Sequence, residues 1–326
     1  MKILVAYSGG KDSQACLLWA VEKFGKEHLE AVFCDTGWEH PETYRHIVKT
    51  TGDLGVKLVT VKSQKFDGMI GLATKKGRFA STQARFCTSE LKSIPFIDYV
   101  LDHKEHLIII QGIRALESYK RSQMEKECRY FKYYFEPYKS NEITIKRLSE
   151  IKLRTAKQNK KLEKAQRRLA EGFKDEKYHT YRKKDVKKWT ERYTDDILRP
   201  VFDWTGQEVI DYIIKSGQQP NTLYKEGFKR VGCFPCIMSG HKEVFEILNR
   251  YPEKFDEIIQ HEKNIGSSFF KIDFVPKYAQ SGVCPRSGKS YTTAEDVKKY
   301  LTDKNNNLDL FEDEAVSCSS YYHLCE

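Results

Sequence analysis

The sequence has no apolar run that approaches the roughly 20 residues needed by a membrane-spanning helix. Its apolar start, residues 1–7, is too short for the core of a signal peptide and leads directly into a glycine-rich loop. The 9 cysteines, an odd number in a chain of 326 residues, are not typical of the disulfide framework of a secreted protein. These absences predict a cytoplasmic protein with no membrane partner.

Outside one segment the sequence has almost no net charge. Residues 146–192 contain 18 Lys and Arg against 7 Asp and Glu, whereas the rest of the chain contains 38 basic and 39 acidic residues. The segment lies within a predicted helical insertion, residues 140–195, whose narrow apolar stripe favours a projecting helix or helical hairpin. The stripe consists of Leu148, Ile151, Leu162, Ala165 and Leu169.

Two interpretations of the basic segment stay open. A clustered basic face is typical of nucleic-acid binding, and the interleaved side chains of Tyr178, Tyr181, Trp189 and Tyr193 could stack on bases. A charge run can also be only a solvated helical hairpin. We favour nucleic acid as the partner of residues 146–192.

Apart from that insertion, short apolar runs alternate with helical patterns. Strands are expected at residues 2–7, 31–34, 57–61, 107–111 and 197–201. This alternation predicts an α/β fold with a parallel twisted sheet flanked by helices. We divide the chain into a nucleotide-binding domain (1–139), the basic insertion (140–195), the completion of the α/β domain (196–250) and a small C-terminal region with a tail (251–326).

Neither common nucleotide-binding loop is present, because the chain lacks both Gly-x4-Gly-Lys-Ser/Thr and Gly-x-Gly-x-x-Gly at its first strand. The first strand is followed instead by Ser8-Gly9-Gly10-Lys11-Asp12-Ser13 and a helical pattern. A strand, a glycine-rich loop and a helix form an anion site from backbone N–H groups and the positive helix end. The alternative, a plain glycine-rich turn, does not explain the two serines and the lysine.

On this loop the sequence resembles the adenine-nucleotide α-hydrolase superfamily, whose pyrophosphate (PP) loop it matches. Further blocks resemble the phosphoadenosine phosphosulfate (PAPS) reductase-like branch. In chain order they are Asp35-Thr36-Gly37, Cys87-Thr88, Gly112-Ile113-Arg114 with Glu117 and Arg121, residues 200–205, Leu223-Tyr224, and Gly232-Cys233-Phe234-Pro235-Cys236. The resemblance implies that an adenine nucleotide is bound beyond the carboxyl ends of the strands.

The resemblance also implies roles for single residues. The phosphates of ATP, with Mg²⁺, would be held by Ser8, Gly9, Gly10, Lys11, Asp12 and Ser13. Asp35 and Thr36 would bind the adenosine part, and Gly112 would complete the nucleotide site. Arg114 and Arg121 could grip a phosphate or sulfate with planar guanidinium groups, or could simply be a surface pair. We expect Lys11, Asp12, Ser13 and Arg114 to take part in catalysis.

Two features separate the sub-branches of this family. Sulfonucleotide reductases usually have a degenerate phosphate loop and a C-terminal Glu-Cys-Gly-Leu-His, whereas this loop is intact and Tyr322-His323-Leu324-Cys325 matches only loosely. The chain therefore looks more like PP-loop enzymes that cleave ATP to AMP and pyrophosphate and put sulfur into nucleic acid, such as the DNA phosphorothioation enzyme. A sulfur-donor protein would then be a partner.

Two alternatives stay open. A sulfonucleotide reductase would use Cys325 or Cys318 as its nucleophile, and a nucleotide-binding module would have kept the loop without catalysis.

The cysteines suggest a metal site. Cys233-x-x-Cys236 is typical of a metal-binding or redox pair, and the resemblance places Cys87 beside it around a [4Fe-4S] cluster. Cys284 is the best candidate for a fourth ligand, since thiolates are the usual cluster ligands. A three-cysteine cluster, a zinc site and a redox dithiol are the alternatives.

Overall fold

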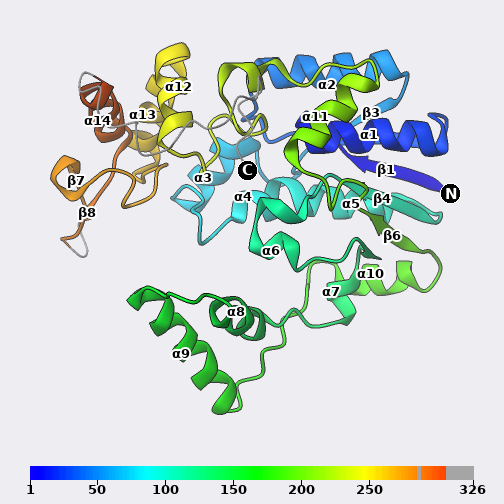
Figure 1. The fold of residues 1–326 in the computed structure, drawn as a ribbon, viewed down its shortest axis with the longest axis horizontal. Coiled ribbons are helices and arrows are strands. Elements are labelled where there is room, and N and C mark those ends of the chain that lie inside the picture. The colour runs from blue at the N-terminus through cyan, green and yellow to red at the C-terminus, as the bar shows by residue number, and fades with distance from the viewer. Residues whose placement is uncertain (285–287, 306–326) are drawn as a thin grey trace.

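The protein, a computed structural model that describes residues 1–284 and 288–305, is built around a six-stranded sheet (Figure 1). The strand order is β3 (Lys57–Val61), β2 (Leu29–Cys34), β1 (Lys2–Ala6), β4 (Leu107–Gln111), β6 (Asp195–Leu198) and β5 (Glu127–Arg129). All neighbouring pairs are parallel except β5–β6. The predicted α/β fold with a mostly parallel sheet is confirmed.

The chain changes direction across the sheet between β1 and β4. It first proceeds from β1 to β2 and β3 on one side, and then returns to place β4 on the other side of β1. In open parallel sheets this switch point leaves a crevice outside the carboxyl ends of the two strands, where ligands bind.

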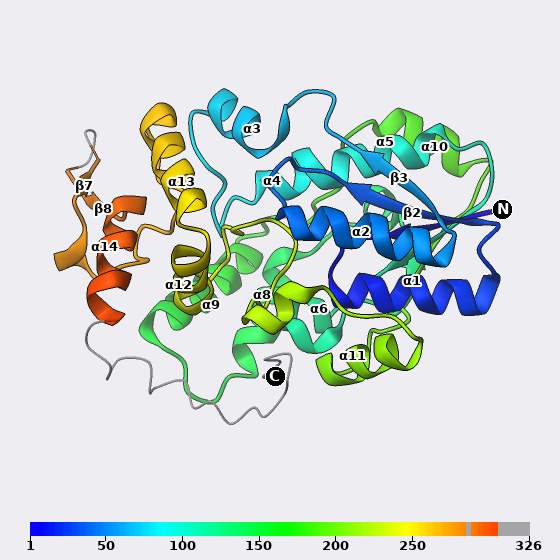
Figure 2. The same ribbon diagram turned by 90° about the horizontal axis from the view of Figure 1, so that it is seen from above.

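Helices cover both faces of the sheet (Figure 2). On one face, α1 (Lys11–Phe24), α2 (Pro41–Leu54) and α11 (Gly206–Lys215) pack with Ile3 and Val5 of β1. On the other face, α5 (Ile94–Asp102), α7 (Lys132–Phe135) and α10 (Lys183–Thr190) pack around Leu4 of the same strand. Successive residues of β1 therefore enter opposite cores, as alternation along a strand requires.

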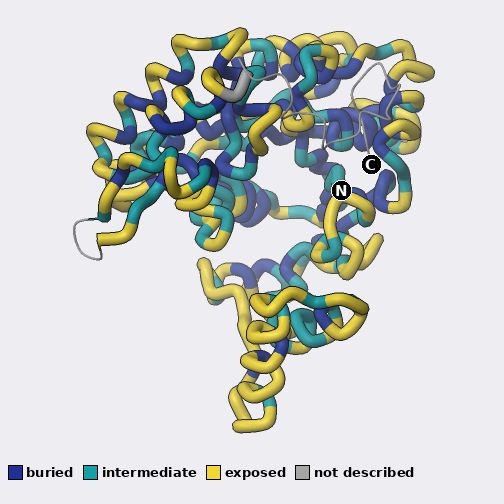
Figure 3. Tube along the Cα trace, turned by 60° about the vertical axis from the view of Figure 1, so that its left-hand side comes forward, coloured by how far each residue is buried: buried dark blue, intermediate teal, exposed yellow. Residues whose placement is uncertain are grey.

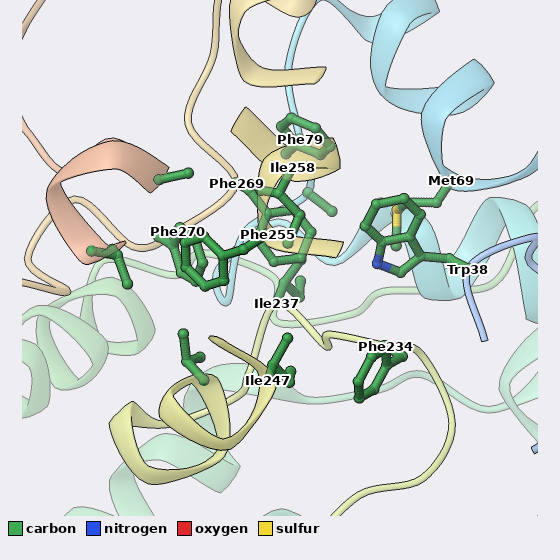
Figure 4. Packing of buried hydrophobic residues seen from close by; sticks show 14 of the residues in the cluster. Trp38, Met69, Phe79, Phe234, Ile237, Ile247, Phe255, Ile258, Phe269 and Phe270 are labelled. Carbon is green, nitrogen blue, oxygen red and sulfur yellow. The ribbon is translucent and has the colours of Figure 1, made fainter. Parts of the chain in front are cut away.

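A third core joins the region after residue 220 to segments from the first third of the chain. It brings together α3 (Gly68–Lys76), α12 (His241–Arg250), α13 (Pro252–Ile265) and α14 (Ala294–Asn305). Figure 4 shows Trp38 and Met69 beside the aromatic cluster of Phe255, Phe269 and Phe270. The division suggested at residue 250 falls between α12 and α13, which share this core, so it is not a boundary between separately packed units.

The predicted basic insertion, residues 140–195, consists of two parts with different packing. Helices α8 (Ser140–Ser149) and α9 (Ala156–Ala170) form a hairpin that stands away from the body and is largely exposed (Figures 1 and 3). By contrast, α10 inserts Val186 and Trp189 into the core on α5. The prediction that all of this stretch projects from the body is therefore wrong beyond the hairpin.

The remaining short elements connect these layers. They are α4 (Phe86–Thr88), η1 (Ser89–Ser93), η2 (Ala115–Glu117), α6 (Tyr119–Ser122), η3 (Thr222–Glu226), η4 (Lys277–Ala279) and the β7 (Gly282–Val283) and β8 (Ser290–Tyr291) hairpin. Within the described ranges, no helix combines the length and the apolar character that crossing a membrane requires.

Candidate functional site

A cavity of about 560 Å³ opens at the switch point, beyond the carboxyl ends of β1 and β4 and at the start of α1. It is lined by Ser8, Gly10, Lys11, Asp12, Ser13, Gly112, Arg114, Leu116, Glu117, Arg121, Tyr224, Lys229, Arg230, Val231 and Gly232. Eight of the predicted nucleotide-binding residues are 8–13, 112 and 121, and seven of these line the cavity. The exception is Gly9. Arg114 lines the cavity as well.

The loop between β1 and α1 is held in one shape by its own hydrogen bonds. The Ser8 N–H donates to Ser13 Oγ at 3.2 Å, and the Ser13 hydroxyl donates to the Gly10 carbonyl at 2.9 Å. Gly9 turns the chain with a φ of +73°, and a Cβ there would lie 3.0 Å from carbon atoms of Thr43 and Ile47. Gly9 therefore packs against Thr43 and Ile47, whereas its neighbours Ser8 and Gly10 line the cavity.

Gly112, directly after β4, lets two backbone segments touch. A Cβ at this position would lie 2.5 Å from the Ser13 nitrogen and 2.6 Å from the Asp12 carbonyl carbon. Because those are backbone atoms, a side chain could be accommodated only if α1 moved. Glycine at 112 therefore sets the distance between β4 and the phosphate loop.

The cavity has a cationic wall. Its lining contains five basic residues and two carboxylates, Asp12 and Glu117. Arg114 Nε donates to Asp12 Oδ1 at 2.7 Å, Lys11 Nζ lies 3.5 Å from Asp12 Oδ2, and Arg121 forms an ion pair with Glu117. Burial lowers the pKa of Arg121, and the nearby positive charges of Arg230, Arg85 and Arg114 also lower it. Cations crowded in this way favour a ligand with several negative charges.

Among the lining residues to which the sequence assigns no role are three polar ones from the second half of the chain, Tyr224, Lys229 and Arg230. The Tyr224 hydroxyl accepts a hydrogen bond from the Lys11 backbone N–H at 3.0 Å, and burial raises its pKa, so it stays a neutral phenol. The sequence does contain a signal for these residues, because Tyr224 belongs to the Leu223-Tyr224 block, and Lys229 and Arg230 lie just before Gly232. Because more than 200 residues separate them from the loop at residues 8–13, the sequence alone does not show that they meet this loop.

Asp35 and Thr36 follow β2, at the same edge of the sheet, but they do not line this cavity. Asp35 accepts hydrogen bonds from the Tyr44 hydroxyl at 2.6 Å and the Gly37 N–H at 2.9 Å, and pairs with Lys62 at 2.9 Å. Burial would raise the pKa of Asp35, but these partners outweigh burial and lower it. Thr36 is buried and donates to Glu39 Oε1 at 2.7 Å. Both side chains therefore stabilise the turn that follows β2.

Three of the four predicted metal-binding cysteines come from segments on one core. Cys87, Cys233 and Cys236 all pack against the third core, and Cys236 Sγ lies 3.9 Å from Arg230 Nη1 at the cavity. Cys233 Sγ lies 3.9 Å from both Glu39 Oε1 and Thr36 Oγ1. Burial raises the pKa of Cys87 and of Cys233, and the nearby Cys236 thiolate would raise both further, so the three cysteines are neighbours.

The predicted fourth ligand lies elsewhere. Cys284 directly follows β7, on the far side of α13 from α4, which contains Cys87 (Figures 1 and 2). In the part of the chain that the structure describes, no three Cys, His, Asp or Glu side chains are grouped so that they could hold a metal ion. The four-cysteine cluster with Cys284 therefore does not fit this arrangement, and a metal site formed by Cys87, Cys233 and Cys236 without Cys284 stays a prediction. Cys318 and Cys325 lie outside the described residues.

The family model of the phosphoadenosine phosphosulfate reductase domain matches residues 2–239. Among solved structures, the PAPS reductase of Candida auris in complex with phosphate superposes with a TM-score of 0.41 and 13% identity, over 72% of this chain and 83% of its own.

Relatives of known sequence include an uncharacterised protein of Escherichia phage 186, which is 24% identical over 99% of this chain and 96% of its own length. An uncharacterised protein of Methanocaldococcus jannaschii is 23% identical over 82% of this chain, which spans only 44% of that protein. An adenosine 5'-phosphosulfate reductase of Neisseria meningitidis serogroup A is 42% identical over 41 residues, 13% of this chain and 17% of that enzyme.

Proposed function

Because the chain belongs to the phosphoadenosine phosphosulfate reductase domain family, we propose that its cavity binds ATP with the phosphates against residues 8–13. The main support is the convergence of Lys11, the Asp12–Arg114 pair and Gly112 on the first turn of α1. Backbone N–H groups at a helix start and buried cations together favour a polyphosphate. Mg²⁺ would enter with ATP as part of the substrate.

We propose that the reaction is cleavage of ATP between its α- and β-phosphates. An oxygen of the acceptor forms a bond to the α-phosphorus, the bond from that phosphorus to the bridging oxygen breaks, and pyrophosphate leaves with the electron pair. Lys11, Arg114 and Arg121 would neutralise the charge that develops on the leaving group. Ser13, at the loop's end, would orient a phosphate oxygen by its hydroxyl.

The acceptor in this proposal is a nucleic acid, and the second step is sulfur transfer. A sulfide sulfur delivered by a donor protein attacks the adenylylated atom, a bond to sulfur forms, and AMP leaves with the former acceptor oxygen. The intact PP loop and the strongly basic segment at residues 146–192 support this assignment over a small acceptor. No step is assigned to a metal cluster.

One assay separates the candidate reactions. The full-length protein is incubated with ATP, tRNA or duplex DNA, and sulfide, in parallel with adenosine phosphosulfate or PAPS and a dithiol. We expect pyrophosphate and AMP from ATP, and none from Lys11→Ala. Tight ATP binding without products would overturn the proposal in favour of a non-catalytic nucleotide-binding module.

The second candidate function is a sulfonucleotide reductase. It is favoured by the 42% identity to the Neisseria adenosine 5'-phosphosulfate reductase, although only over 41 residues. In that reaction a cysteine thiolate, from Cys325 or Cys318, would attack the sulfate sulfur, AMP or adenosine bisphosphate would leave, and the dithiol would release sulfite. Sulfite formation without pyrophosphate would identify this reaction.

A further inference from the structure

We propose that the exposed face of α9 binds the sugar–phosphate backbone of a nucleic acid and leads it toward the nucleotide cavity. The inference deepens the proposed function, on which it rests for the identity of the reaction. Within the basic segment at residues 146–192, the contact with nucleic acid is assigned to α9 and not to the lysines of α10.

The hairpin of α8 and α9 is attached firmly at its root. The buried Asp175 carboxylate accepts hydrogen bonds from the backbone N–H groups of Asn141 at 2.6 Å and Glu142 at 3.1 Å, so it caps the start of α8. The Tyr138 N–H donates to the Lys177 carbonyl at 2.8 Å and ties the two ends of the hairpin together. These bonds hold the two ends of the hairpin side by side.

The hairpin is joined to the element that lines the cavity. Lys146 Nζ of α8 donates to Gln123 Oε1, directly after α6, at 3.1 Å. Tyr119 begins α6, whose Arg121 lines the nucleotide cavity. In Figure 1, α6 lies between the body and α8. A polynucleotide on the hairpin would thus reach the cavity along α6.

The charge on α9 is unbalanced and exposed. The helix contains six basic residues, Lys157, Lys160, Lys161, Lys164, Arg167 and Arg168, and one acidic residue, Glu163, all exposed. Among the described residues, none of the four lysines forms a salt bridge, and only Arg167 has a carboxylate partner, Glu171 at 3.7 Å. Lysines 157, 161 and 164 and Arg168 recur every three or four residues, so they share one face.

The length of this face fits a nucleic-acid backbone. From Lys157 to Arg168 the helix rises about 16 Å, at roughly 1.5 Å per residue. Along one strand of duplex DNA the phosphates lie about 3.4 Å apart on the axis, so that distance spans about five phosphates, close to the four cations of the face.

The face does not fit a protein partner, because the apolar residues Leu162 and Ala165 are buried against α8 and leave no apolar centre between the cations. A capping box at Thr155 and Gln158 fixes the start of the helix.

The lysines of α10 lie at the opposite edge of the sheet. Trp189 Nε1 donates to the His103 carbonyl at 2.7 Å, and the Leu107 N–H donates to the Thr194 carbonyl at 2.9 Å, so α10 ends beside the amino end of β4. The nucleotide cavity lies at the carboxyl ends. Trp189 of α10 is buried and cannot stack on a base, whereas Tyr178 and Tyr181, which precede α10, are exposed.

The test compares two variants of the full-length protein that each lose four positive charges. One replaces Lys157, Lys160, Lys161 and Lys164 with Gln, and the other replaces Lys183, Lys184, Lys187 and Lys188 with Gln, which keeps helix propensity. Binding of a labelled duplex and a labelled single strand is measured between low and moderate salt. The wild-type log affinity should fall with log salt by about 0.7–0.9 per phosphate contacted.

We expect the α9 variant to bind at least about tenfold more weakly with a flatter salt slope, and the α10 variant to bind within about twofold of wild type. Equal losses in both variants, or no loss in the α9 variant, would overturn the inference. Displacement of the nucleic acid by polyglutamate at equal charge concentration would also overturn it, since the surface would then bind any polyanion.

ATP affinity, measured separately, should be unchanged in both variants because neither helix lines the cavity. This separates the two proposals. A wild-type protein that binds nucleic acid through α9 but forms no AMP would overturn the proposed function and leave the α9 surface intact.

Discussion

Arg114 Nε and Asp12 Oδ1 form a hydrogen bond of 2.7 Å across the switch point of the sheet, although 102 positions separate the two residues in the chain. Asp12 lies in the first turn of α1, and Arg114 follows β4. The bond therefore ties together the two segments that flank the cavity. It also holds the Arg114 guanidinium so that its other nitrogens, one of them 3.4 Å from the Trp204 carbonyl, have a fixed direction.

Arg114→Ala should lower both stability and ATP affinity. The substitution leaves the partly buried Asp12 carboxylate without its guanidinium donor, which costs roughly 1–3 kcal/mol of unfolding free energy. Urea unfolding and calorimetric ATP titration measure the two effects. Arg114→Lys is the matched variant, because it keeps the charge but not the planar fork, and should recover only part of either loss. Wild-type ATP affinity in Arg114→Ala would show that the pair is not part of the site.

Gly112→Ala should disrupt the phosphate loop, whereas Gly232→Ala should not. Both glycines line the cavity, but a Cβ at 112 meets the backbone of Asp12 and Ser13, and a Cβ at 232 meets nothing within 4 Å. We expect Gly112→Ala to lose about 2 kcal/mol or more of stability, in the range of overpacking, together with ATP binding. Retention of ATP binding by Gly112→Ala would mean that the loop does not need this close approach.

Tyr224→Phe should weaken the start of α1 without changing the charge of the cavity. It removes the acceptor of the Lys11 N–H, a bond worth about 1 kcal/mol. Tyr212→Phe is the control, since its hydroxyl donates to the exposed Glu22 far from the loop. Thermal unfolding with and without ATP should show a larger loss for Tyr224→Phe. Equal losses for the two variants would contradict a role for Tyr224 in the loop.

The free energy of unfolding should fall as the pH is lowered from 7 to 5, because His46 stays unprotonated in the folded protein over this range. Burial lowers the pKa of His46 to about 4, and its Nε2 lies 3.1 Å from Gln14 Oε1. Below about pH 6.5 the unfolded chain takes up a proton that the folded protein does not, so the unfolding free energy drops, by about 2 kcal/mol between pH 7 and 5.

Urea unfolding at both pH values should show this drop, and His46→Gln should reduce it. The same drop in His46→Gln would assign the pH dependence to other groups.

The sequence was sufficient to predict the sheet and most of the cavity because the signals are local. The loop at residues 8–13 follows a buried strand directly, and Arg114 follows another. What it could not predict depends on tertiary packing. Val186 and Trp189 lie in a lysine-rich stretch, so only their contact with α5 shows that α10 is part of the body. Cys284 was grouped with distant cysteines by residue type alone, and Tyr224 approaches Lys11 only in the folded chain.

The central claim concerns which bond of ATP is broken, and product analysis with ATP labelled in its γ-phosphate tests it most directly. With nucleic acid and a sulfide donor present, the account predicts that the label appears in pyrophosphate, with AMP in equal amount, and that Lys11→Ala forms neither. Label in inorganic phosphate together with ADP would contradict the account, because the site would then cleave the terminal phosphate bond.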